Sequence, residues 1–302
     1  MAEPRETSGC ADRQPNQLGR GIAYACGTVA LFAGFVIVSR FGLSTTLTPV
    51  DISALRFGIA GILLSPILLK HGLSGLRVSQ AVTLAALGGL AFALFAYAGF
   101  ALAPAANGAV LIHGTLPLTT ALVMWGSGIG VAGRSQRAGL AIIALGMAAI
   151  TWDGLAEASV TVLAGDLCLL LASLCWSGYG LYVKRLGLPA IRAAAIVAGL
   201  SALIFLPVYT VLPGKTLSQA HWQDLLLQGF FQGILIGAVS IIIYTRAVAL
   251  LGVVKVSFFT AAVPGLTTLG GFFLLNEVSS LATLAGVALT TLGMLIAFRG
   301  SF

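Results

Sequence analysis

Long apolar stretches, separated by short polar segments, follow one another along almost the whole chain. Each stretch is long enough to cross a hydrocarbon core of about 30 Å as a helix. The polar/apolar alternation of a membrane β-barrel is absent from the sequence, so we expect helices that satisfy their own backbone hydrogen bonds. We predict an all-α integral membrane protein with ten transmembrane helices, at about residues 21–39, 52–69, 80–102, 106–128, 136–152, 166–183, 193–212, 225–246, 253–275 and 281–298.

The segments outside these spans are short. Residues 1–18 are polar and carry charges of both signs, which predicts a disordered tail. Acidic residues interrupt the basic region before the first apolar run, which is not typical of a signal peptide. The span at residues 136–152 is the shortest, so we expect it to stand close to the membrane normal.

The two halves of the chain resemble each other. Shifting the chain so that Pro117 meets Pro264 also brings Gly146 onto Gly293. This spaced pattern predicts an internal repeat, with residues 19–152 as the first copy and residues 153–302 as the second. Each copy holds five spans, and because five is odd the second copy enters the membrane from the opposite side. Two inverted five-helix repeats are typical of transporters.

Basic residues are distributed unevenly across the predicted membrane. With the N-terminus in the cytoplasm, all of the 16 Lys and Arg residues fall on the inner side except Arg40, Arg56 and Lys215. This bias predicts that both termini are cytoplasmic and that the number of spans is even. We therefore expect a multi-pass protein of the cell (inner) membrane.

The composition agrees with a membrane protein and narrows the expected partners. Hydrophobic residues make up 58% of the chain, charged residues only 8%, and the mean hydropathy is +1.03, whereas about a quarter of the residues of soluble domains are charged. The net charge of +7 reflects the inner-side bias and does not indicate nucleic-acid binding. We expect a monomer that contacts the lipid bilayer and a small-molecule substrate, with no cofactor and no metal, since the four cysteines show no paired spacing.

Four motifs resemble the drug/metabolite transporter superfamily, EamA type. They are "ALRF" (54–57), "ALAPAANGAVLIHGTLPL" (101–118), "GDLCLLLASLCWSGYGLYVKRL" (165–186) and "VPGLTTLGGFFLLNEVSSLATLAGVALTTLGMLIAF" (263–298). The resemblance covers nearly the whole chain and implies an exporter of amino acids, including aromatic ones, or of other metabolites or drugs. Two positions depart from the pattern: Gly130 stands at the first-half equivalent of Glu277, and Phe32 stands where many relatives have tryptophan.

Pro117 and Pro264 lie near the middle of the equivalent fourth and ninth spans. Proline has no amide hydrogen, so these residues leave the carbonyls of His113 and Thr260 without their helical hydrogen bonds. Because free carbonyls are costly in lipid, we expect helix kinks that face protein or a wet cavity and take part in gating. Kinks that only improve packing are the alternative.

The fourth span also carries two polar side chains. His113 lies about two turns from its outer end and is expected to line a substrate cavity. A neutral histidine bonded to a neighbouring helix is the alternative. Asn107 is nearer the surface, and we expect it to cap the start of the span, or else to lie at an entrance.

Further cavity candidates lie on the spans that border the centre in the resembled family. A mostly apolar cavity with a few polar points suits an amphipathic solute, although packing alone is the alternative for any single aromatic residue. The candidates are the aromatic residues Phe32, Tyr97, Phe100, Trp176, Tyr179 and Tyr244 and the hydroxyl residues Thr28, Ser240, Ser257 and Thr260.

Two cations are candidate entrance or gate residues. Lys255 begins the ninth span on the cytoplasmic side, where its side chain either extends to the headgroups or attracts a carboxylate at the inner entrance. Arg56 is expected to pair with Asp51 or Asp166 on the outer side, as a contact that stabilises the fold or as part of an outer gate.

The charges that are missing bear on the mechanism. No Asp or Glu falls in the middle of a predicted span, so a carboxylate proton relay is not available. We therefore predict a facilitative exporter that works by alternating access and is not an enzyme. The alternatives are a proton-coupled exporter of drugs, nucleobases or metabolites that uses His113, a channel, and a membrane-embedded enzyme acting on lipid-linked substrates.

Overall fold

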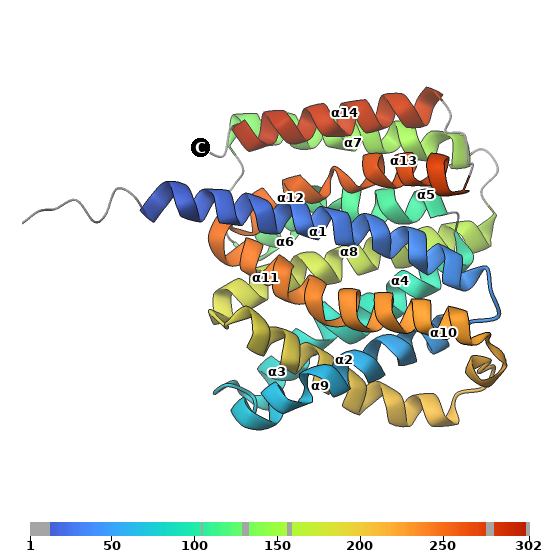
Figure 1. Cartoon of the computed structure of the whole chain (residues 1–302). Coiled ribbons are helices and arrows are strands. Elements are labelled where there is room, and N and C mark those ends of the chain that lie inside the picture. Colours follow the sequence, from blue (N-terminus) through green and yellow to red (C-terminus); the bar gives the residue numbers. More distant parts are fainter. Residues whose placement is uncertain (1–12, 104, 129–132, 156–158, 276–280, 300–302) are drawn as a thin grey trace, which may run out of the picture.

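The computed structural model describes residues 13–103, 105–128, 133–155, 159–275 and 281–299. These parts of the chain are helical, and no strand occurs among them. The helices run side by side as one bundle (Figure 1). Gly130 and Glu277, which mark the departure from the family pattern, lie outside the described residues.

The first half of the chain forms seven α-helices and two π-helical segments. Its elements are α1 (Arg13–Leu43), α2 (Pro49–His71), α3 (Val78–Ala85), η1 (Ala86–Leu90), α4 (Ala91–Leu102), α5 (Ala105–Gly108), η2 (Ala109–Gly114), α6 (Leu116–Gly126) and α7 (Arg134–Leu155). The segments α3, η1 and α4 follow one another without a break.

The second half has a similar order of elements. They are α8 (Val160–Leu186), α9 (Ala190–Val211), the 3-10 turn η3 (Leu217–Gln219), α10 (Trp222–Gln228), the π-helical segment η4 (Gly229–Val239), α11 (Ser240–Leu251), α12 (Val253–Thr260), α13 (Val263–Leu275) and α14 (Leu281–Arg299).

The lengths and composition of these helices match a membrane protein. Within the described residues, seven helical segments are long and apolar enough to cross a membrane, and two shorter apolar helices, Leu116–Gly126 and Leu284–Ala297, accompany them. The predicted all-helical membrane fold is therefore confirmed.

Two boundaries differ from the sequence prediction. Helix α1 begins at Arg13, so residues 13–18 are helical and not disordered, and the part of α1 that is apolar enough to cross a membrane begins at Gln17. Residues 1–12 lie outside the described part. Helix α7 has 22 residues and extends beyond the span predicted at 136–152, because polar residues at both of its ends also adopt the helical conformation.

The fourth and ninth spans are broken helices rather than single kinked ones. The amide of Thr115, which follows η2, donates to the Val110 carbonyl at 3.0 Å, and Pro117 lies in the first turn of α6. Helix α12 ends at Thr260, and Pro264 is the second residue of α13. In the first turn of a helix the missing amide hydrogen of proline costs no hydrogen bond. The two prolines therefore start new helices at equivalent places in the two repeats.

Helices α7 and α14, the last of each repeat, pack against each other through glycine. A Cβ atom on Gly146 would lie 2.7 Å from the carbonyl oxygen of Gly286, and one on Gly293 would lie 2.7 Å from the carbonyl oxygen of Gly139. The two helices are antiparallel, since Gly139 lies against Gly293 and the later residue Gly146 lies against the earlier residue Gly286. Gly139 is the repeat equivalent of Gly286, and Gly146 that of Gly293, so exchanging the repeats maps one contact onto the other. Small residues allow this close approach of two backbones.

The contacts between the other helices are also related by the repeat, so that each contact has an equivalent when the two repeats are interchanged. Helix α2 packs on its equivalent α9, α4 packs on α8, and α1 packs on α11, while α6 contacts α12 and η2 contacts α13 in the middle. Figure 1 shows α7 and α14 along one edge of the bundle, α2, α3 and α9 along the opposite edge, and the broken helices between them. The centre of the molecule is therefore built from elements of both repeats.

The glycine contact between α7 and α14 predicts that an added methyl group changes the free energy of unfolding differently at two glycines. Gly146→Ala places its Cβ against the backbone of α14, and should lower the free energy of unfolding by about 1–3 kcal/mol. Gly126→Ala, at the exposed end of α6, meets no atom within 4 Å and should leave the stability unchanged or raise it by up to about 1 kcal/mol. Thermal or denaturant unfolding of the purified protein in detergent measures both, and equal effects would contradict the close contact.

Candidate functional site

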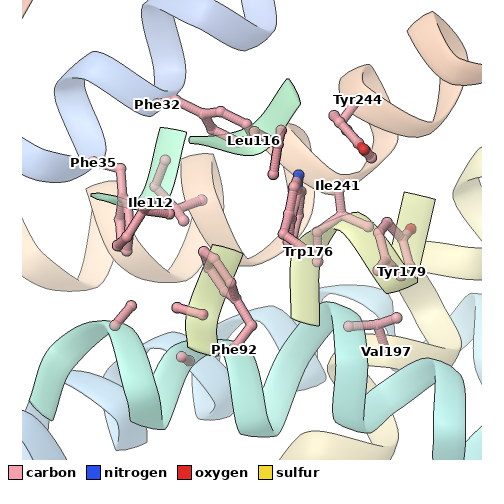
Figure 2. Close-up of a cluster of buried hydrophobic side chains, with 14 of the residues drawn as sticks. Phe32, Phe35, Phe92, Ile112, Leu116, Trp176, Tyr179, Val197, Ile241 and Tyr244 are labelled. Carbon is pink, nitrogen blue, oxygen red and sulfur yellow. The ribbon is translucent and has the colours of Figure 1, made fainter. Parts of the chain in front are cut away.

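Aromatic rings from both repeats meet at the centre of the bundle (Figure 2). Phe32 of α1 stacks on His113 of η2 with ring centroids 4.4 Å apart, and it lies 5.5 Å from Trp176 of α8. The Trp176 ring is 4.9 Å from Tyr244 of α11 and 5.2 Å from Tyr179 of α8. All five side chains are buried. The structure thus brings together five of the predicted cavity residues, which we call the central aromatic cluster.

Several polar atoms in the central aromatic cluster lack a hydrogen-bond partner. Among the described residues, nothing bonds to either ring nitrogen of His113, to Nε1 of Trp176 or to the hydroxyl of Tyr244. Leaving one buried polar group unsatisfied costs about 1–3 kcal/mol. The Tyr179 hydroxyl, in contrast, is bonded to Oγ1 of Thr245 at 2.7 Å. Unpaired polar atoms between aromatic walls are the arrangement that binds the polar and apolar parts of a small solute.

The rings continue toward the predicted outer side and reach a buried cation. Phe35 lies 6.2 Å from His113, and Phe92 lies 4.8 Å from Trp176. The guanidinium carbon of Arg56 on α2 is 5.4 Å from the centre of the Phe92 ring. Only 1% of Arg56 is exposed, and neither Nη1 nor Nη2 has a hydrogen-bond partner in the described part of the chain.

A row of polar side chains lies beside this cation. The hydroxyl of Tyr97, next to Arg56, donates to Oε1 of Gln232 at 2.9 Å. The Nε2 atom of Gln232 donates to the Ser39 hydroxyl, also at 2.9 Å. The predicted cavity residue Tyr97 is therefore buried one layer outward from the central aromatic cluster, where its ring is 5.8 Å from that of Phe35.

Hydroxyl groups hold the broken fourth span to α8. Oγ1 of Thr119 lies 3.0 Å from the Ser173 hydroxyl and 2.7 Å from the Ser177 hydroxyl. Thr115 bonds to Ser173 at 3.1 Å, and Thr120 bonds to Ser177 at 3.2 Å. Because these buried groups satisfy one another, the helix break stays joined to its neighbour at little cost.

A pocket of about 410 Å³ lies between α6, α7 and α12, whose ends here belong to the predicted cytoplasmic side. Pro117, Thr120 and Ser257 form part of its wall, and the exposed residues Trp125 and Arg137 also line it. Its remaining walls come from Ala121, Met124, Gln136, Leu140, Val254 and Phe258. Since Thr120 is bonded to α8, the wall of the pocket is tied directly to the helix that carries the central tryptophan.

On the predicted outer side, the buried carboxylate of Asp51 joins three parts of the chain. It accepts hydrogen bonds from the hydroxyls of Thr48 at 2.6 Å, Tyr209 at 2.6 Å and Thr216 at 2.8 Å. The amide groups of Thr48 and Thr216 donate to it as well, at 3.0 and 3.2 Å. These four residues, which we call the outer latch, connect the start of α2 to the end of α9 and to the segment before η3.

The pair predicted between Arg56 and Asp51 or Asp166 is not formed. The oxygens of Asp51 serve the outer latch, and Asp166 accepts a hydrogen bond from Nδ2 of Asn107 at 2.8 Å. Residues five positions apart on a helix lie on different faces, so Arg56 points to the interior while Asp51 points to α9. Asn107 was expected to cap its own span, and instead its side chain links the first repeat to α8.

The predicted hydroxyl residues are buried, but each donates to a carbonyl of its own helix. Their donor–acceptor distances are 2.7–2.9 Å. They offer a solute only their acceptor lone pairs, and of the four only Ser257 lines the pocket. The residues are Thr28, Ser240, Ser257 and Thr260. Lys255 is half-buried on α12, beside the pocket-lining residue Val254.

Sequence reasoning missed part of the site. Phe35 lies one turn after Phe32, and Ser173 and Ser177 lie one turn apart on α8. Residues one turn apart share a helix face, so the helical spacing could have indicated these three. Phe92 had no such signal, because only packing of α4 against α8 brings its ring to the centre.

The described residues provide no evident metal centre. No three His, Cys, Asp or Glu side chains among them lie close enough to hold one ion. His113 is surrounded by rings rather than by further ligand atoms, so the geometry suits an organic solute better than a metal.

Comparison with known proteins places the chain in a family. The model of the EamA-like transporter family matches residues 19–152 and again residues 163–299, which together make up most of the chain. No curated protein sequence matches. Several solved structures do; one, titled "Crystal structure of protein", has a TM-score of 0.62 and 21% sequence identity, and the match covers 95% of this chain and 98% of that one, which shows the fold. The resemblance that the motifs indicated is confirmed, and the chain belongs to the EamA-like transporter family of multi-pass membrane proteins that transport small molecules.

Proposed function

We propose that this protein exports small amphipathic metabolites, above all amino acids with aromatic or hydrophobic side chains, by facilitative alternating access. The observation that carries the proposal is the central aromatic cluster, where unpaired polar atoms of His113, Trp176 and Tyr244 are enclosed by rings from both repeats. A solute with hydrogen-bonding groups and an apolar side chain suits both features of this site. Polar groups left unpaired inside a membrane are typical of functional sites.

The difference between the two sides of the bundle supports alternating access. On the predicted cytoplasmic side, a pocket lined by Arg137 lies between the ends of α6, α7 and α12. On the predicted outer side, the outer latch joins the start of α2 to the end of α9. In this proposal the structure represents the inward-facing arrangement. Because the repeats are inverted copies, the exchanged arrangement would open the other side at a similar free energy.

We further propose that the protein lies in the inner cell membrane with both termini in the cytoplasm, and that it works as a monomer. The distribution of basic residues supports this orientation. A single chain contains both repeats and hence the complete central aromatic cluster, so no second copy is needed to build the site.

A proton-coupled exporter is the second candidate, and one observation favours it. Both ring nitrogens of His113 lack partners, so this ring is able to accept a proton when the site opens to water. Dependence of the flux on a pH gradient separates this candidate from facilitative export.

The first test is counterflow in liposomes that contain the purified protein. Vesicles preloaded with unlabelled L-phenylalanine should accumulate labelled L-phenylalanine in a saturable manner, with no stimulation by a pH gradient. L-tryptophan, L-leucine, uracil and an organic cation complete the panel, and protein-free vesicles are the control. Stimulation by the gradient would replace facilitative export by proton coupling, and a lack of counterflow for every solute would refute the proposal.

Two tyrosine variants separate solute binding from fold stability. Tyr244→Phe removes a hydroxyl without a partner, so the unfolding midpoint should stay the same or rise while counterflow falls by about tenfold. Tyr179→Phe removes a hydroxyl bonded to Thr245, and should instead lower the free energy of unfolding by about 1 kcal/mol with a smaller effect on flux. Unchanged counterflow in Tyr244→Phe would show that the solute binds elsewhere.

The outer latch predicts a shift of conformation in Asp51→Asn. Loss of the charged acceptor weakens several hydrogen bonds at once and should favour the outward-facing arrangement by about tenfold. A membrane-impermeant maleimide added from outside should then modify a Ser39→Cys reporter faster in an otherwise cysteine-free protein. Asp224→Asn, an acid of α10 outside the latch, should leave the rate unchanged. Equal rates in all backgrounds would mean that the latch does not control access.

A further inference from the structure

Arg56 is a buried cation that the fold does not explain. Its exposed fraction is 1%, and both terminal nitrogens of its guanidinium lack hydrogen-bond partners among the described residues. A charge inside a membrane protein is costly, and such charges are normally paired or serve function. The feature therefore calls for a negative group that none of the described residues supplies at Nη1 or Nη2.

Two acidic side chains on the predicted outer side, Asp51 and Asp166, are engaged elsewhere. Asp51 accepts its hydrogen bonds from the outer latch, and Asp166 accepts from Asn107. The guanidinium instead faces the Phe35 ring at 5.8 Å and the Phe92 ring at 5.4 Å, and the neutral hydroxyl of Tyr97 lies next to it. Cation–π contacts with these rings offset part of the desolvation cost, but Nη1 and Nη2 still have no hydrogen-bond partner among the described residues.

The same two rings connect Arg56 to the central aromatic cluster. Phe92 lies between Arg56 at 5.4 Å and Trp176 at 4.8 Å. Phe35 lies between Arg56 at 5.8 Å and His113 at 6.2 Å. An anion held by the guanidinium would therefore place an attached apolar body among these rings, within reach of the unpaired nitrogens of Trp176 and His113.

We propose that Arg56 anchors the carboxylate of the transported solute through two parallel N–H···O hydrogen bonds. The planar guanidinium matches the two oxygens of a carboxylate, which an ammonium group does not. The substrates are then carboxylates that carry an aromatic or other apolar body, which sharpens the substrate class of the proposed export and rests on that proposal.

The position of Arg56 also fits a closed step of transport. The guanidinium is buried and does not line the cytoplasmic pocket, so a solute in that pocket reaches it only after the surrounding rings separate. Arg56 and Asp51 belong to the same helix, α2, so a carboxylate bound at the anchor acts on the element that the outer latch holds.

The test compares two ligands of the same shape and different charge. In detergent, 3-phenylpropionate should raise the unfolding midpoint of the full-length protein, and 3-phenylpropionamide should not. In Arg56→Gln the midpoint should respond equally little to both ligands, while Arg56→Lys should keep part of the response. Arg246→Gln, a change of the same charge at an exposed position, should behave as the wild type.

Counterflow gives a second readout of the same contact. Arg56→Gln should raise the KM for L-phenylalanine by about tenfold or more and leave the KM for L-phenylalaninamide nearly unchanged. If Arg56 had only a structural role, Arg56→Gln would instead change the KM for both substrates by the same factor.

The outcomes separate the anchor from export itself. If the wild type is not stabilised by 3-phenylpropionate, or is stabilised equally by the amide, the anchor is refuted even where no variant folds. If the acid stabilises the wild type selectively but no solute shows counterflow, the anchor stands and export is refuted. If counterflow occurs without any preference for the carboxylate, export stands and the anchor is refuted.

Discussion

The cost of leaving a polar group unpaired inside a membrane is the constraint on which this structure depends. Many of the described buried polar groups satisfy one another: the hydroxyls of α6 and α8 form hydrogen bonds together, and Asp51 accepts hydrogen bonds at the predicted outer ends. Single side chains such as Ser201 and Thr290 have an unpaired atom elsewhere, but at the centre three neighbouring side chains do, those of His113, Trp176 and Tyr244. A solute that forms hydrogen bonds to these atoms removes the cost of leaving them unpaired, and for this reason we propose the central aromatic cluster as the binding site.

In the proposed transport cycle, the repeat architecture separates contacts that stay fixed from contacts that change. Glycines bring the backbones of α7 and α14 together at one edge of the bundle. This contact is symmetric, because each repeat contributes equivalent glycines to it. In the middle, both spans that meet across the repeats are broken where proline starts a new helix. A short helix can change its angle to its neighbours without unfolding a whole span, so movement at the centre need not disturb the edge.

The ends of the bundle are chemically unlike even though the halves are copies. Basic side chains and a pocket characterise the predicted cytoplasmic side, and a closed set of hydrogen bonds around Asp51 characterises the outer side. Between them, Arg56 and the rings of Phe35 and Phe92 place positive charge next to an apolar site. The arrangement offers complementary contacts to both ends of an amphipathic acid.

The all-helical membrane class, the repeat and the family could be predicted without a structure, because they follow from apolar run length, spacing and motifs that need no knowledge of contacts. The sequence also named His113, as a polar residue inside a span, and the aromatic residues Phe32, Trp176, Tyr179 and Tyr244, because the resemblance implied that their spans border the centre. Which buried polar atoms find hydrogen-bond partners could not be predicted in this way. Pairing depends on distances between helices, so the unpaired state of Arg56 and the ring of Phe92 beside it became visible only once the helices were packed.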